Sequence, residues 1–328
     1  MVLMMTKGIR MKQGSFSMTG FFDKGKTTKR ERFLAEMDQV VPWQRLLALI
    51  EPHYPKANPE GGRPPLPLER MFRIYCLQQW YNLSDPGAEE ALYDSLTMRQ
   101  FANVRTDADV IPDESSILNF RQLLVKHQLT AQLLTEINTH LSERGLLLGK
   151  GTIVDATIID APSSTKNAKK KRDPQMHQTR KGKQWYFGMK VHTGTDTDSG
   201  IVHTVVGTAA NVADINVLGE LMHGAEESLH GDSAYHSKAL KAQADAAGVA
   251  FNVNQRGTRS KPLTEAQRMR NRRLSRVRAT VEHPFLVVKH LWGHAKVRYR
   301  GIKKNLAQMY TLFALANVFR MRRQLMIT

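Results

Sequence analysis

The sequence contains one cysteine, Cys76, among 328 residues. A single thiol forms no internal disulfide, which excludes a disulfide framework, and it cannot supply the ligand set of a cysteine-based zinc finger. Such sparse cysteine usage is typical of proteins in a reducing compartment. We therefore expect a cytoplasmic chain that folds without covalent cross-links.

Long apolar runs are also absent. The most apolar late stretch, residues 306–319, includes Gln308 and Asn317 and is shorter than the ~20 residues that a bilayer span needs. The opening MVLMM is too short for the apolar region of a signal peptide and leads into Lys7 and Arg10. We predict no membrane partner and interpret residues 306–319 as a buried helix.

Acidic residues are few beside the basic ones. The chain has 48 Lys and Arg against 30 Asp and Glu, a formal net charge of +18. Residues 162–183 hold eight cations against one acid, Asp173, and residues 256–304 hold fifteen against Glu265 and Glu282. Cations clustered in this way suit a phosphate backbone, so we expect a nucleic-acid partner. The alternative for each run is a solvated face or a flexible tail.

The first part of the chain has helical patterning. Residues 1–30 are rich in Gly, Lys, Ser and Thr without periodicity, and we expect them to form a mobile basic tail. Residues 31–148 repeat apolar side chains every three or four positions, which predicts an all-α domain. The clearest helical stretches are 68–83, 87–102 and 116–141.

The character of the sequence changes at Gly149. Short runs of β-branched and aromatic residues bounded by Gly, Asp and Asn predict strands. These runs are 150–162, 184–196, 200–210, 227–235 and 249–255. Helical patterns alternate with them, the longest from about Glu265 to Leu291. Residues 149–328 are therefore predicted to form an α/β domain, a sheet flanked by helices.

Three acids in the second half are candidates for phosphate chemistry. Transfer or hydrolysis of a phosphodiester needs a strong oxygen nucleophile, and two Mg²⁺ roughly 4 Å apart, held by converging carboxylates, provide it. Asp155 lies inside an apolar strand pattern, where a bare acid is costly unless it faces a ligand. Asp232 follows another predicted strand, and Glu282 lies on the arginine-rich helix.

Each acid also has an ordinary interpretation. An Asp near a strand end is often a turn or helix cap, and a Glu among arginines is often part of an ion pair. Asp160, five residues after Asp155, points to the opposite face of a regular strand and is expected to start the following turn. Asp214 is expected to cap a helix.

Several runs resemble the DDE transposases of the insertion sequence five family: GTIVDATIIDAPSSTKN, RDPQMHQTRKGKQWYFGMKVH, HGDSAYHS and RATVEHPFLVVKHLWGHAKVRYRG. Likeness in GRPPLPLERMFRIYCLQQWYNLSD and LFALANVFR extends the resemblance from about residue 30 to 320. It implies an RNase H-like fold, a mixed sheet flanked by helices, preceded by an all-α domain that binds DNA ends or dimerises. It also implies that Asp155, Asp232 and Glu282 are catalytic and hold two Mg²⁺, with Mn²⁺ as a substitute.

Related transposases carry a signature of Tyr, two residues, Arg, three residues, Glu, six residues and Lys. Arg278, Glu282 and Lys289 match it, whereas Ser275 stands at the tyrosine position. The resemblance thus implies that Arg278 and Lys289 contact DNA and leaves the tyrosine contact in doubt. Pro284, two residues after Glu282, is expected to kink or restart the helix.

The basic segment 162–183 supplies four further candidates for DNA contact, Lys169, Lys170, Lys171 and Arg172. Its few aliphatic side chains cannot bury enough surface to offset the entropy of ordering. We therefore expect this segment to be mobile in the free protein and to become ordered over DNA.

Three more candidates lie elsewhere. Residues 116–129, after Pro112, Asp113 and Glu114, are compatible with the second helix of a helix-turn-helix, in which Asn119 and Arg121 would contact bases or phosphates. An ordinary amphipathic helix pair is the alternative. Lys190, on a predicted strand, is a candidate supporting DNA contact, with a plain strand surface as its alternative.

The resemblance implies a nucleoid-associated enzyme that binds the inverted terminal repeats of its element in double-stranded DNA as a homodimer. It would hydrolyse a phosphodiester to release a 3′-hydroxyl and direct that hydroxyl at target DNA. One alternative is a nuclease of the same fold without strand transfer. Another is a DNA-binding regulator with an inactive site, against which the three acids argue.

Overall fold

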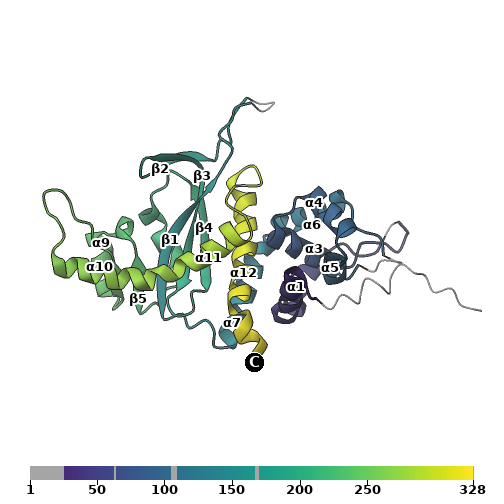
Figure 1. Cartoon of the computed structure of the whole chain (residues 1–328), viewed down its shortest axis with the longest axis horizontal. Coiled ribbons are helices and arrows are strands. Elements are labelled where there is room, and N and C mark those ends of the chain that lie inside the picture. The colour runs from purple at the N-terminus through teal and green to yellow at the C-terminus, as the bar shows by residue number, and fades with distance from the viewer. Residues whose placement is uncertain (1–25, 63, 105–108, 167–169, 328) are drawn as a thin grey trace, which may run out of the picture.

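The computed structural model describes residues 26–62, 64–104, 109–166 and 170–327. Residues 1–25 of the expected tail, and Lys169, lie outside the described residues. Figure 1 shows a helical N-terminal part and an α/β part, with the long C-terminal helix standing between them.

The N-terminal part is helical, as predicted. Side-chain caps begin several helices: Thr28 forms a capping box with Glu31, and the Ser84 and Ser95 hydroxyls accept backbone N–H groups. The third predicted stretch breaks at Gln128, whose φ is 54°. The helices are α1 (Lys29–Val40), α2 (Trp43–Ile50), the 3₁₀ turn η1 (Glu51–His53), α3 (Leu68–Tyr81), α4 (Asp85–Asp94), α5 (Leu96–Phe101), α6 (Glu114–Lys126) and α7 (Leu129–Glu143).

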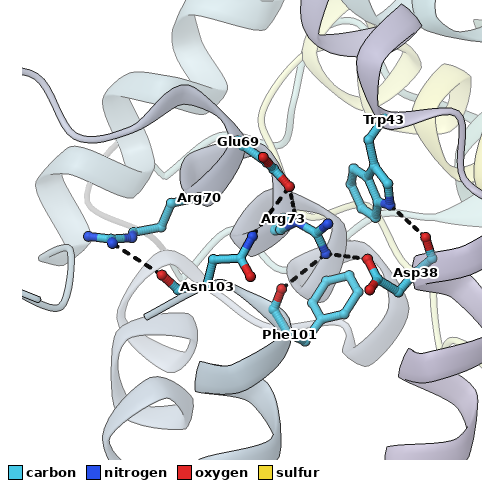
Figure 2. Close-up of polar contacts among 7 residues, drawn as sticks. All are labelled: Asp38, Trp43, Glu69, Arg70, Arg73, Phe101 and Asn103. Atoms are coloured by element: carbon cyan, nitrogen blue, oxygen red, sulfur yellow. Dashed lines mark hydrogen bonds and ion pairs between the residues drawn. The ribbon is translucent and has the colours of Figure 1, made fainter. Parts of the chain in front are cut away.

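A buried arginine ties four of these helices together. The Arg73 guanidinium on α3 donates to the Asp38 carboxylate at 2.6 Å, to Glu69 at 2.7 Å and to the Phe101 carbonyl at 3.2 Å (Figure 2). It also lies 4.2 Å from the centre of the Trp43 ring. Arg73 therefore serves the packing of α1, α2, α3 and α5, and not every cation of this basic chain is available to a polyanion.

The second half contains a six-stranded mixed sheet in the order β2-β3-β1-β5-β6, with β4 paired to β3. β1 is antiparallel to β3 and parallel to β5. The five predicted strands are confirmed, and β2 is additional. The strands are β1 (Gly151–Asp160), β2 (His177–Lys181), β3 (Gln184–Asp196), β4 (Val202–Ala209), β5 (Ser228–Gly231) and β6 (Ala250–Val253).

The expectation that the basic segment is mobile is wrong for residues 170–183. β2 pairs with β3 along its whole length. The Asp173 carboxylate accepts the Gly301 N–H at 2.6 Å, and the Gln175 side chain accepts the Ile302 N–H at 2.7 Å. Met176 is buried. Partners distant in sequence thus supply the contacts that the segment lacks on its own.

The remaining helical elements flank the sheet. The predicted helix from Glu265 to Leu291 is interrupted: a 3₁₀ turn follows its first part, a new α-helix begins at Glu282 with Pro284 in its first turn, and a π-helical turn ends it. The expected kink or restart of the helix near Pro284 is found as a restart at Glu282, two residues earlier. These elements are η2 (Asp214–Val217), α8 (Leu218–Leu221), η3 (Ser233–Tyr235), α9 (Lys238–Ala246), α10 (Glu265–Arg278), η4 (Ala279–Val281), α11 (Glu282–Leu286), η5 (Val287–Leu291) and α12 (Ile302–Ile327).

One large hydrophobic cluster joins the two parts. It contains buried residues of α1, α3, α7 and α12 together with Ile159, Met189 and Val191 from one face of the sheet. A smaller cluster on the other face includes Val154 and Tyr235. The prediction that residues 306–319 form a buried helix is confirmed by α12. Within the described ranges, no helix combines the length and apolar character that crossing a membrane requires.

Candidate active site

The pairing of β1 with β5 brings two of the three candidate acids together. Residues 151–153 pair in parallel with residues 228–230. Continuing this register by two positions sets Asp155 beside Asp232, with neighbouring backbones ~4.8 Å apart as in any sheet. The two acids are thus neighbours across the junction of two parallel strands.

Alternation along the strands also places both acids on one face. A Cβ at Gly231 would lie 3.2 Å from side-chain atoms of both Val154 and Tyr235, so Val154 and Gly231 face the smaller cluster. The following residues, Asp155 and Asp232, therefore point to the opposite face. That is the face crossed by α10 and α11 in Figure 1.

Asp155 is a half-buried acid with little compensation. Burial raises the pKa of its carboxyl to about 6; the Ala156 N–H and the nearby Arg278 oppose this rise, and Asp232 adds to it. Within the part of the chain that the structure describes, the hydrogen bond that this carboxylate accepts comes from the Ala156 N–H, at 2.8 Å. Two close carboxylates in such surroundings are stabilised by a cation between them.

Asp232 combines both interpretations made from its sequence position. It precedes the 3₁₀ turn η3, and its Oδ1 accepts the Ala234 N–H at 2.8 Å, as a helix cap does. Its other carboxylate oxygen remains for a further contact.

Glu282 lies near the pair through its backbone. It directly follows η4, which packs against β1, but its side chain is exposed. Across the described ranges, no three His, Cys, Asp or Glu side chains converge closely enough to hold a metal ion. The structure therefore unites Asp155 with Asp232 and leaves Glu282 outside their immediate group.

The donor chemistry of the pair fits a divalent cation. Asp155 and Asp232 offer hard carboxylate oxygens, the type that Mg²⁺ prefers. A dication would also relieve the mutual repulsion that helps to raise the pKa of Asp155.

Two of the predicted DNA contacts, Arg278 and Lys289, lie near Asp155. Arg278, at the end of α10, is the cation that most strongly lowers the pKa of Asp155. The Lys289 ammonium donates to the Thr157 hydroxyl at 3.1 Å and to the Ile158 carbonyl at 2.9 Å. Burial lowers the pKa of Lys289, and Asp160 opposes that effect. Lys289 is thus hydrogen-bonded to β1 at Thr157 and Ile158, close to Asp155 along the strand.

Lys190 makes contacts inside the protein. Its ammonium donates to the Val212 carbonyl at 2.8 Å and to the Asp214 carboxylate at 2.9 Å. The expectation that Asp214 caps a helix is wrong, because Asp214 is the first residue of η2 and makes no cap hydrogen bond. Its carboxylate pairs with Lys190 across the sheet instead.

Among the described residues, the helix-turn-helix geometry expected for residues 116–129 is not present. Residues 102–113 connect α5 to α6, a link far longer than the 3–4-residue turn of that motif. Arg121 is 8% exposed, donates to the Asp85 carboxylate at 2.7 Å and stacks 4.3 Å from the Tyr299 ring centre. Asn119 is exposed beside a surface hollow.

The described cations of the basic segment differ in their contacts. Lys170 is exposed with a φ of 46°. Arg172 donates to the Ser163 carbonyl at 2.7 Å and lies 5.3 Å from the Phe187 ring centre. Lys171 and Arg172 line a hollow at the end of β1.

The sequence did not point to Tyr235 as a residue near the site. Its hydroxyl is buried and, among the described residues, lacks a hydrogen-bond partner. Burial raises its pKa, and the charges of Asp214, Asp155 and Asp232 add to the rise. The signal was the aromatic residue three positions after Asp232 in HGDSAYHS.

Two protein-family models match this chain and identify the kind of protein that carries the pair of acids. The family described as the transposase DDE domain matches residues 147–318, more than half of the chain. A second family, described as a transposase domain, matches residues 22–123. The chain belongs to the DDE transposase family. Its mixed sheet, flanking helices and helical N-terminal part form an RNase H-like fold, and it is an enzyme of DNA transposition that cleaves and transfers DNA.

Proposed function

We propose that this DDE transposase belongs to the insertion sequence five family and mobilises one insertion sequence. It binds the terminal inverted repeats, hydrolyses phosphodiester bonds to free 3′-hydroxyl ends and transfers those ends to target DNA. The adjacent pair of Asp155 and Asp232 carries this proposal, because a half-buried carboxylate pair at the end of parallel strands suits phosphodiester chemistry.

In this proposal Asp155, Asp232 and Glu282 hold two Mg²⁺ ions, for which Mn²⁺ substitutes. The ions, when bound, would activate the attacking oxygen and stabilise the leaving oxygen. Asp155 and Asp232 present their oxygens from one face of the sheet, and Glu282 contributes from the first turn of α11. Arg278 and Lys289 lie near Asp155 and would balance phosphate charge beside it.

Double-stranded DNA is the proposed substrate at both stages, as element end and as target. Arg278, Lys289 and the cations 169–172 are proposed phosphate contacts, and Asn119 is exposed on the helical part for a similar role. Lys190 and Arg121 are proposed instead to support the structure, because each is paired with an acid. An element has two equivalent ends, so we propose that a homodimer with two-fold symmetry acts on them.

The decisive experiment supplies pre-cut element ends, a supercoiled target plasmid and Mg²⁺ to the purified protein. The proposed function predicts joined products that disappear with Asp232→Asn and Glu282→Gln and on chelation of the metal. Asp160→Asn is the matched control, because Asp160 lies on the same strand as Asp155 and points to the other face.

Two results would contradict parts of this proposal. Cleavage of intact ends without joining of pre-cut ends would identify a nuclease. Joining by Glu282→Gln at the unmodified rate would remove Glu282 from the catalytic set.

A further inference from the structure

Residues 298–304 lead into α12 and form its first turn, at the upper end of that helix in Figure 1. This segment is rich in positive charge. Residues 298–304 contain Arg298, Arg300, Lys303 and Lys304 and no acid. Arg300, Lys303 and Lys304 are exposed. The segment thus presents several cations to solvent within a few residues.

A hollow of about 250 Å³ lies on one side of this segment. Arg298 and Arg300 line it together with Lys171 and Arg172 from the basic segment. Asp173 is the acid in this lining, and its carboxylate accepts the Gly301 N–H. Two basic regions that are far apart in sequence therefore converge on one surface.

A larger hollow of about 610 Å³ lies on the other side. Lys304 lines it with Lys126, and so do His53 and His127, whose rings stack 4.4 Å apart. Lys303 lines a neighbouring hollow of about 280 Å³. No acid lines either of these two hollows within the part of the chain described.

The segment is held firmly between the helical part and the sheet. Tyr299 stacks against Arg121, and the Arg298 guanidinium donates to the Asn82 carbonyl at 2.7 Å. The Asn305 side chain accepts the backbone N–H groups of Arg298 and Tyr299, both at 3.1 Å. A surface fixed in this way loses little conformational entropy when it binds a ligand.

The start of the segment is anchored to the strand that carries Asp155. Asp160 donates its N–H to the Ala295 carbonyl and accepts the Val297 N–H. Asp160 lies five residues beyond Asp155, which corresponds to roughly 17 Å along a strand.

We propose that residues 298–304, with the hollows on either side, form a phosphate track that binds the backbone of duplex DNA beside the cleaved bond. The inference rests on the proposed function for the position of the cleaved bond. It goes further in assigning Arg300, Lys303, Lys304 and Lys126 to the duplex beside the active site. The repeated charges of DNA match a line of cations, whereas a small anion would need only one hollow.

The test measures binding of a 30-base-pair mixed-sequence duplex to the full chain without divalent metal, over a series of salt concentrations. Arg300→Gln and Lys304→Gln are each expected to lower the slope of log K against log salt by about 0.9, and the double variant by about twice that amount. Arg323→Gln is the matched control, since Arg323 is an exposed cation on α12 roughly 29 Å from Lys304. Its slope should equal that of the unmodified protein.

Footprinting on a pre-cut element end locates the contact. We expect protection of the duplex backbone beyond the 3′ end, and loss of that protection in the double variant with an unchanged melting temperature. The track is overturned if the double variant keeps both the slope and the protection of Arg323→Gln. If the unmodified protein binds no duplex, the proposed function fails instead, so the two failures are distinguishable.

Discussion

Two acids at β1, the buried Glu226 and the half-buried Asp155, are held in opposite ways. Glu226, near the start of β1, is 7% exposed and accepts the His223 N–H at 2.6 Å, the Gly224 N–H at 2.8 Å and the Thr152 hydroxyl at 3.1 Å. Burial favours its neutral form, but these hydrogen bonds outweigh burial and lower its pKa.

Asp155, three residues beyond Thr152 on the same strand, has one backbone N–H and a second carboxylate beside it, and its pKa is raised to about 6. We propose that this contrast distinguishes an acid that stabilises the fold, Glu226, from an acid that is available for catalysis, Asp155. An acid whose lone pairs are filled by the fold stabilises the fold, whereas an acid left short of partners can accept a cation.

The largest effect should come from Asp155→Asn. We expect cleavage of element-end DNA to fall by more than the ~10–100-fold typical of residues that only support metal ligands. The melting temperature should stay unchanged or rise, because the substitution removes a poorly compensated, half-buried charge. Initial cleavage rates and thermal unfolding of the same preparation check this. A variant that lost activity only because it unfolded would contradict the distinction.

Glu226→Gln should show the reverse behaviour. An amide in place of the carboxylate turns an NH₂ group toward backbone N–H donors, so we expect the free energy of unfolding to fall by about 2–3 kcal/mol. Cleavage by the folded fraction should be unchanged. Urea unfolding, with cleavage assayed well below the melting temperature, measures both quantities. Loss of cleavage with full stability would place Glu226 among the functional acids.

A smaller effect is expected at Arg121, where sequence and structure suggest different roles. Arg121→Gln removes the charged hydrogen bond to Asp85 and should lower the free energy of unfolding by about 1–2 kcal/mol. The salt slope of duplex binding should remain unchanged. Lys126→Gln is the matched control on α6, because Lys126 is exposed and should alter the slope with little effect on stability. A reduced slope for Arg121→Gln would restore it as a phosphate contact.

The sequence predicted those elements whose own residues specify them. The five expected strands have β-branched or aromatic residues bounded by turn formers, and all five are present. β2 was missed because its residues are nearly all exposed and carry no apolar alternation. It exists through pairing with β3, a contact that its local sequence does not encode.

The sequence likewise predicted one part of the candidate site and missed another. Asp155 and Asp232 were recognisable because an acid within or directly after an apolar strand is costly without a ligand. A break near Glu282 was expected from Pro284, but its form was not: a 3₁₀ turn and a π-helical turn lie on either side of α11. These turns change the direction of side chains, which periodicity in a sequence cannot show.

By itself, the sequence determined the positive charge, the order of the elements and the strands that carry Asp155 and Asp232, since these follow from residue types and short-range patterns. Tertiary structure decided that β1 and β5 are parallel neighbours, which turns two distant acids into a pair. It also decided which cations face solvent: Arg121 and Lys190 are paired with Asp85 and Asp214, while Arg300 and Lys304 are exposed. The reason is physical, because the partner of a charged side chain comes from long-range packing.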